Sequence, residues 1–221
     1  MIITISHPLT PESPMYPGTP DILIQQYKSM DAGDSANSST VTFNSHSGTH
    51  LDFPRHFCQT AMTAKDLFPR IHSLFPAYVI DLPVPESREI TCQDLESGIH
   101  RHNDARALFI RTGWGKVRAA DRNAYRHDHP WISEKIPDYL RTHCPEISLF
   151  GLDQLSVSSP AHRETGRECH RQFLCHKNPI LLLEDANLGD ERLNTGACTL
   201  LLFPYIIGDL DGIPVTALME R

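Results

Sequence analysis

Short apolar runs bounded by turn-forming residues constrain the fold of this chain more than any other feature of its sequence. Each run has the length of a strand with at least one buried face. Proline and glycine between the early runs indicate turns. The strands predicted on this basis cover residues 2–5, 22–27, 40–43, 78–82, 107–112, 147–153, 180–184, 199–207 and 214–219.

Helices are predicted between some of these strands, over residues 91–99, 133–144 and 167–177. Thr91 is a suitable N-cap for the first, and Pro137 is expected in the first turn of the second. The mixture indicates an α/β or α+β fold whose strand order these patterns do not specify. No repeat or flexible linker divides the sequence, so a single domain over residues 1–221 is expected.

Composition excludes several classes of function. A formal net charge of -7 without a cluster of Lys and Arg argues against a nucleic-acid binder. The longest apolar run, residues 198–208, is interrupted by Pro204 and is expected to be a core strand rather than a membrane helix. Six cysteines without a CxxC pair, and no secretory leader, indicate reduced thiols in a cytoplasmic protein. The expected partner is a small molecule.

Residues 46–56, HSGTHLDFPRH, form the most informative segment. His46, His50, Asp52 and His56 are separated by even numbers of residues, which places their side chains on one face of an extended chain. A straight strand would hold His46 and Asp52 about 20 Å apart, at about 3.3 Å per residue, so the segment must bend. Gly48 permits one such bend, and Pro54 provides a second change of direction.

Two imidazoles and a carboxylate form a site suited to Zn²⁺, Mn²⁺ or Fe²⁺. Three protein ligands would leave positions open for water, which is typical of a catalytic rather than a structural metal site. A histidine-rich polar loop is the alternative, and the spacing alone favours the metal site only slightly in a chain with 13 histidines.

The segment also resembles a known family. Its residues match the HxGTHxDxPxH motif of the cyclase-like family of metal-dependent hydrolases, which includes bacterial kynurenine formamidase and isatin hydrolase. The resemblance extends to ITISHPLTPESPMYPGTP, LFIRTGW, GLDQLSV and HRQFLCHKNPILLLEDANL, and so covers most of the chain. It implies a single-domain α/β fold with a central β-barrel-like sheet flanked by helices.

The resemblance also implies a ligand set and a cofactor. The cofactor is one or two divalent ions, Zn²⁺ or Mn²⁺, with Asp52 able to bridge two of them. His162 and His176 remain alternatives to His170 as a later ligand. The implied ligands are His46, His50, Asp52, His170 and Glu184.

His56 has a different role in this resemblance, as the general acid and base, and an unperturbed histidine pKa of about 6.5 suits proton transfer at neutral pH. The implied reaction is metal-assisted hydrolysis of an aryl amide or formamide such as N-formylkynurenine. A cyclic amide or lactone, as for isatin hydrolase, is the alternative substrate. A non-catalytic relative that binds a metal or a small acid is the alternative function.

Aromatic side chains near the motif are candidates for the walls of an aryl-binding pocket. Tyr16 and Phe53 are predicted to bind substrate. Trp114 is a further candidate, for which core packing or an exposed loop position is the favoured alternative. The resemblance further implies a homodimer or homotetramer in which a neighbouring amino-terminal segment borders the site.

Overall fold

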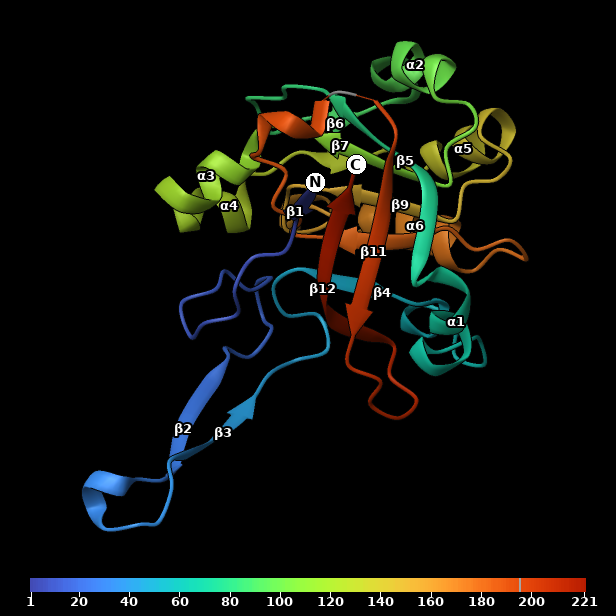
Figure 1. The fold of residues 1–221 in the computed structure, drawn as a ribbon. Coiled ribbons are helices and arrows are strands. Elements are labelled where there is room, and N and C mark those ends of the chain that lie inside the picture. The colour runs from blue at the N-terminus through green and yellow to red at the C-terminus, as the bar shows by residue number, and fades with distance from the viewer. Residues whose placement is uncertain (195) are drawn as a thin grey trace.

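A closed ring of strands forms the centre of the molecule in this computed structural model, which describes residues 1–194 and 196–221 (Figure 1). Seven strands of the described chain close the ring in the order β12-β11-β5-β7-β9-β10-β4, and β4 pairs back with β12. The ring strands are β4 (His50–Asp52), β5 (Ser73–Asp81), β7 (Ala107–Arg111), β9 (Leu149–Leu152), β10 (Leu181–Glu184), β11 (Cys198–Pro204) and β12 (Gly212–Glu220). The expected single-domain α/β fold with a barrel-like sheet is confirmed.

Strand β4 closes the ring because both of its edges are paired. β5, β7, β9 and β10 run parallel to one another, whereas β4 is antiparallel to both β10 and β12. Asp52 lies opposite Leu182 on one side and Gly212 on the other. All three residues of this strand are buried, so the motif predicted to bind metal is also part of the barrel wall.

Helices lie around the barrel and connect its strands (Figure 1). The helices are α1 (Ala64–Ile71), α2 (Cys92–Arg101), α3 (Trp114–Ala120), α4 (Arg122–His127), α5 (Ile136–His143) and α6 (Arg163–Leu174). Thr91 caps α2 in a capping box with Asp94, and Pro137 lies in the first turn of α5, as predicted. α6 begins four residues before the predicted start, and α1, α3 and α4 were not predicted.

The predicted strand over residues 199–207 is too long at its carboxyl end. β11 ends at Pro204, and the next three residues are exposed, with Tyr205 at 74%. Proline lacks the N–H that a central strand needs to continue its ladder. The expectation that this whole apolar run lies in the core is therefore wrong for Phe203, Tyr205, Ile206 and Ile207.

Cys58 and Cys175 form a disulfide across 117 residues of sequence. The bond joins the segment after the 3-10 helix η2 (Pro54–His56) to the residue that ends α6. The expectation of reduced thiols is wrong for this pair, because their proximity depends on tertiary packing and not on a local motif. Cys92, Cys144, Cys169 and Cys198 are free thiols.

A two-stranded hairpin extends away from the barrel (Figure 1). Its strands, β2 (Leu23–Lys28) and β3 (Ser38–Thr42), are exposed at every residue. The remaining strands are β1 (Ile2–Thr4), which pairs with the end of β12, and the short parallel pair β6 (Glu89–Ile90) and β8 (Trp131–Ile132). Within the described residues, no helix is long and apolar enough to cross a membrane.

Candidate metal centre

The segment from residue 46 to residue 56 bends at the two predicted places. Gly48 has a φ of +59°, in the left-handed region that glycine adopts most easily. A Cβ at this position would also lie 2.3 Å from Cδ2 of Leu9, so the bend excludes a side chain. Pro54 begins η2 immediately after β4. The predicted bends at Gly48 and Pro54 are therefore confirmed.

The carboxylate of Asp52 lies at the centre of the cluster and is 1% exposed. Its Oδ1 is 2.7 Å from Nδ1 of His46 and 3.2 Å from Nε2 of His50. Its Oδ2 is 3.6 Å from Nε2 of His170 and has no hydrogen-bond partner. A buried carboxylate oxygen without a donor is costly, and a bound cation would satisfy it.

Glu184 supplies a second carboxylate from the end of β10. Its Oε1 accepts hydrogen bonds from the Val157 N–H (2.8 Å) and from the Ser156 hydroxyl (3.1 Å). The same carboxylate lies 3.6 Å from Nε2 of His50 and 3.5 Å from Nε2 of His170. Two ligands about 2.1 Å from one tetrahedral ion are about 3.4 Å apart, so these separations suit atoms that share an ion.

Backbone carbonyls orient the two buried imidazoles. His50 donates its Nδ1–H to the Gly48 carbonyl at 2.8 Å, and His170 donates its Nδ1–H to the Gly166 carbonyl at 2.7 Å. In each ring Nε2 then carries the lone pair and faces the carboxylates. Metal-binding histidines commonly have this second hydrogen bond, which fixes both tautomer and orientation. The donor set therefore fits a divalent ion.

Asp211 joins the opposite side of the cluster and was not identified from the sequence. Its Oδ2 accepts from Nε2 of His46 (2.9 Å) and from Nδ1 of His56 (3.1 Å), while its Oδ1 accepts from the Ser45 hydroxyl (3.0 Å). Its backbone carbonyl accepts from the Phe53 N–H at 2.9 Å. Asp211 lies 155 residues after His56, in a turn without any recognisable motif, so nothing local indicated its position.

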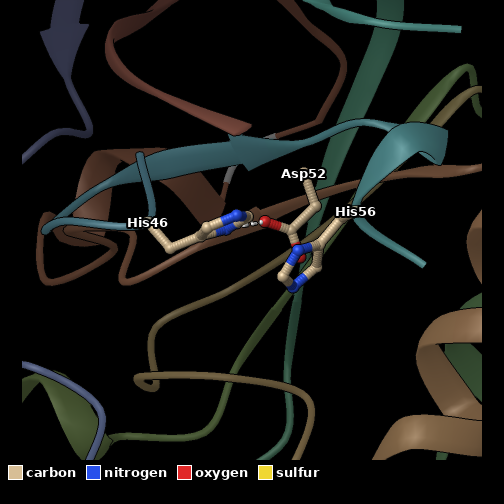
Figure 2. Close-up of side chains that lie close together, drawn as sticks. All are labelled: His46, Asp52 and His56. Carbon is tan, nitrogen blue, oxygen red and sulfur yellow. Dashed lines mark hydrogen bonds and ion pairs between the residues drawn. The ribbon is translucent and has the colours of Figure 1, made fainter. Parts of the chain in front are cut away.

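The rings of His46 and His56 converge on Asp52 from the two ends of the motif (Figure 2). Their ring centroids are 3.9 Å apart. Gly212 makes room for this arrangement, because a Cβ there would lie 2.5 Å from Cε1 of His46. Ligand-type atoms of His46, Asp52 and His56 all lie within 4.8 Å of one another, as do those of His50, Asp52 and Glu184.

Strong electrostatic coupling accompanies this packing. Burial by itself lowers the pKa of His46, but the charge of Asp52 and hydrogen bonds with Asp211 and Asp52 outweigh burial and raise its pKa to about 10. Burial raises the pKa of Asp52, yet the charges of His46 and His56 hold it well below its usual value. Hydrogen bonds from His46 and His56 likewise lower the pKa of Asp211. In the metal-free protein His46 therefore forms ion pairs with Asp52 and Asp211.

Of the three later histidines considered as ligands, the structure brings His170 to the cluster. It is 5% exposed and its Nε2 faces Asp52. His162 is exposed and stacks on Trp131 at a centroid distance of 3.7 Å. His176 is also exposed and hydrogen-bonds the backbone of Asn178. The open alternatives to His170 therefore lie outside the cluster.

A cavity of about 480 Å³ opens onto the cluster. Tyr16, Phe57 and Leu155 are among its lining residues. Phe53 is fully buried in the hydrophobic core and is not part of the lining, so its prediction as a substrate contact is wrong. Alternation along the strand explains this, because Asp52 and Phe53 point to opposite sides. Trp114 is buried in a small cluster with Leu155 and is not part of the lining.

A buried ion pair stabilises the turn that follows Glu184. Asp185 has a φ of +52°, which is unusual for a residue other than glycine, and is fully buried. Arg118 binds its two carboxylate oxygens at 2.7 and 2.8 Å, and the Tyr125 hydroxyl donates to it at 2.6 Å. The Asp185 carbonyl accepts from the hydroxyl of Thr49 in the motif (2.6 Å). This connection links the end of β10 directly to the segment before β4.

Comparison with known proteins identifies the family. Residues 3–159 match the Cyclase family, described as "Putative cyclase". The chain belongs to this family. It is 28% identical over 226 residues to a kynurenine formamidase of Geobacillus thermodenitrificans, covering 99% of this chain and 97% of that protein. It is 29% identical over 218 residues to a kynurenine formamidase of Bacillus cereus, covering 99% and 96%.

Several solved structures share the fold of this chain. An isatin hydrolase bound to the product analogue thioisatinate superposes with a TM-score of 0.83 at 20% identity, covering 99% of this chain and 91% of that chain. Isatin hydrolase A from Ralstonia solanacearum gives a TM-score of 0.81 at 19% identity with the same coverage. At these identities the similarity establishes the fold of this family member and not its substrate.

Zn²⁺ binding is expected to release protons. Coordination requires neutral imidazole, and the pKa of His46 is about 10, so His46 must lose a proton when it binds the ion at neutral pH. The apparent affinity of this step should rise about tenfold per pH unit between pH 6 and pH 8, because both values lie below that pKa. Titration calorimetry in buffers of different ionisation enthalpy measures the number of protons released.

His46→Gln should release fewer protons than the unmodified protein. The matched control is His176→Gln, at an exposed histidine outside the cluster, which should leave proton release unchanged. Unchanged proton release in His46→Gln would show that His46 is not a ligand.

Proposed function

We propose that this protein is a metal-dependent amidohydrolase that cleaves the C–N bond of an aryl amide or formamide. The observation that carries the proposal is the buried Asp52 carboxylate, whose Oδ2 lacks a hydrogen-bond partner while lying among histidine nitrogens and a second carboxylate. The names of the kynurenine formamidase relatives support the reaction class. We assign this activity to one domain spanning residues 1–221.

We assign one or two divalent ions, Zn²⁺ or Mn²⁺, to this cluster. The oxygens of Asp52 face different histidines, so this residue can serve two positions. A bound ion supplies Lewis acidity, which polarises a carbonyl and lowers the pKa of water. The proposed ligands are His46, His50, Asp52, His170 and Glu184.

His56 is the proposed general acid and base. It lines the cavity, and its Nδ1 is hydrogen-bonded to Asp211. When Asp211 accepts the Nδ1–H, Nε2 is the nitrogen free to take a proton and return it to the leaving amine. Asp211 is itself held by the hydroxyl of Ser45. The pair resembles the general arrangement in which a carboxylate orients a catalytic imidazole.

The cavity suits an aromatic substrate. Its volume of about 480 Å³ lies in the range of small-molecule sites, and Tyr16, Phe57 and Leu155 provide flat and apolar contacts. Phe57 also stacks on His170, with ring centroids 4.7 Å apart, so an aryl group placed against it would lie beside the cluster.

The cytoplasmic location expected from the sequence stays a prediction.

A cyclic amide or lactone is the second candidate substrate, favoured by the similarity of the fold to isatin hydrolases. A protein that only binds a metal or a small acid is the non-catalytic alternative. The presence of His56 beside the proposed ligands favours catalysis over binding alone.

Chelation should abolish hydrolysis. We expect the purified protein to contain a divalent metal by elemental analysis and to hydrolyse N-formylkynurenine in an absorbance assay. Treatment with a chelator should remove both the metal and the activity, and added Zn²⁺ or Mn²⁺ should restore them.

Isatin is the comparison substrate in the same assay. Turnover of isatin alone would select the cyclic-amide alternative. Stoichiometric metal without turnover of a panel of amides and lactones would instead support a binding protein, and activity that survives complete removal of metal would contradict the proposal.

His56→Asn should lower turnover by about 10²- to 10⁴-fold, the contribution typical of a general acid and base. Asparagine retains a similar size but does not transfer protons near neutral pH. Metal content should stay the same, because His56 is not one of the proposed ligands. His176→Asn is the control outside the cavity and should leave both quantities unchanged. Equal loss of metal and activity in His56→Asn would identify His56 as a ligand.

We also propose a homo-oligomer, a dimer or tetramer, assembled through the β2–β3 hairpin. An isolated two-stranded hairpin is marginally stable in water, and this one projects from the body of the protein (Figure 1). Ile24 and Val41 lie opposite each other and are 48% and 51% exposed. Tyr27 is 73% exposed. Packing against a second copy would bury these side chains.

Charge on the hairpin should dissociate the oligomer. We expect Ile24→Lys with Val41→Lys to reduce the mass measured by size-exclusion chromatography with light scattering, because the two lysines would lie in the interface. The control replaces Gln25 and Thr40, the adjacent cross-strand pair on the opposite face, with lysine and should leave the mass unchanged. An unmodified protein that is monomeric at all concentrations would contradict the proposed assembly.

A further inference from the structure

One face of α6 carries two arginines in line with His170. Arg163, Arg167 and His170 are spaced four and three residues apart, which places them on the same side of a helix. All three line the cavity that opens onto the metal cluster. This face of α6 therefore contributes both a proposed ligand and two positive charges to one site.

The charges of the cavity are separated along the helix. With a rise of about 1.5 Å per residue, Arg167 lies about 4.5 Å and Arg163 about 10 Å along the axis from His170. His170 is buried, whereas both arginines are exposed. The buried carboxylate of Glu184 therefore lies at the deep end of the cavity, whereas the two exposed arginines lie toward the solvent.

Neither arginine is held strongly by the protein. Arg167 is paired with Glu164 at 2.5 Å, but their side chains are 53% and 83% exposed, and such surface pairs contribute little free energy. Among the described residues, no carboxylate lies within ion-pair distance of Arg163. Arg163 also begins α6, where the helix dipole favours an anion. Both guanidinium groups are available to a ligand.

Arg171, the next arginine on the helix, serves as a comparison because it occupies an ordinary surface position. Arg171 is exposed, is paired with Glu168 at 2.8 Å, and does not line the cavity. Arg163 and Arg167 differ from it by facing the same cavity as the metal cluster, in a chain whose formal net charge is -7.

We propose that Arg163 and Arg167 form an anion subsite, which selects aryl amides whose carboxylate lies at the end remote from the scissile C–N bond. This inference rests on the proposed hydrolase function and specifies its substrate class. Guanidinium groups bind carboxylates through two parallel hydrogen bonds, which fixes the orientation of the ligand. An aryl group between the two ends would contact Tyr16 and Phe57. The subsite favours an open-chain acidic aryl amide over a small neutral ring such as isatin.

Two substrates that differ only in charge test the subsite. The probes are 4-(2-formamidophenyl)-4-oxobutanoate and its neutral carboxamide. We expect the unmodified protein to have a kcat/KM at least tenfold higher for the carboxylate. Arg163→Gln and Arg167→Gln should each lower that value about tenfold through KM, with kcat and the carboxamide values changed less than twofold. Arg171→Gln, the matched control on the same helix, should change neither substrate.

Equal losses for both probes would show a structural effect and overturn the subsite, as would no loss for either probe. A binding measurement distinguishes failure of the anion subsite from failure of the proposed hydrolase function. Calorimetry is carried out on the full chain after chelation, with the non-hydrolysable 4-oxo-4-phenylbutanoate and its carboxamide as ligands. It measures the contribution of the two arginines to ligand affinity without metal or turnover. Arginine-dependent binding of the anion without hydrolysis would support the subsite and contradict the hydrolase. Hydrolysis without preference for the anion would support the hydrolase and contradict the subsite.

Discussion

Burial of the Asp52 carboxylate is the constraint on which the rest of the site depends. An ionised carboxylate loses its hydration when it is buried and must recover that free energy from nearby charges. Asp52 does so through His46 and His50, while its second oxygen faces His170 without a hydrogen bond. The same residue belongs to the strand that closes the barrel. Closure of the barrel and assembly of the cluster are thus one structural event.

The register of the strands beside β4 determines which distant residues join the cluster. Glu184 pairs with His50 in the β4–β10 ladder, and Gly212 pairs with Asp52 in the β4–β12 ladder. Asp211 therefore reaches the motif from the residue before β12. A one-residue shift in either ladder would turn the carboxylate of Glu184 or the turn at Asp211 away from the histidines.

The two ends of the cavity carry different groups, one set suited to catalysis and the other to substrate binding. Buried carboxylates and imidazoles at the deep end suit a metal and a proton-transferring His56, whereas the exposed arginines of α6 suit an anion. Because His170 and Arg167 are three residues apart on one helix, the distance between their backbone positions is set by helix geometry. A loop would not fix that distance as closely.

The sequence by itself determined the local features of this protein. Most of the longer strands, the capped start of α2, and the bends at Gly48 and Pro54 depend on backbone preferences and on patterns within a few residues. The resemblance to the family extended this to His170 of α6 and Glu184 of β10, which the structure brings to the same cluster. Only the tertiary structure decided the place of Asp211, the Cys58–Cys175 disulfide and the burial of Phe53. The first two depend on contacts across more than 100 residues, which strand order and register create and no local pattern encodes.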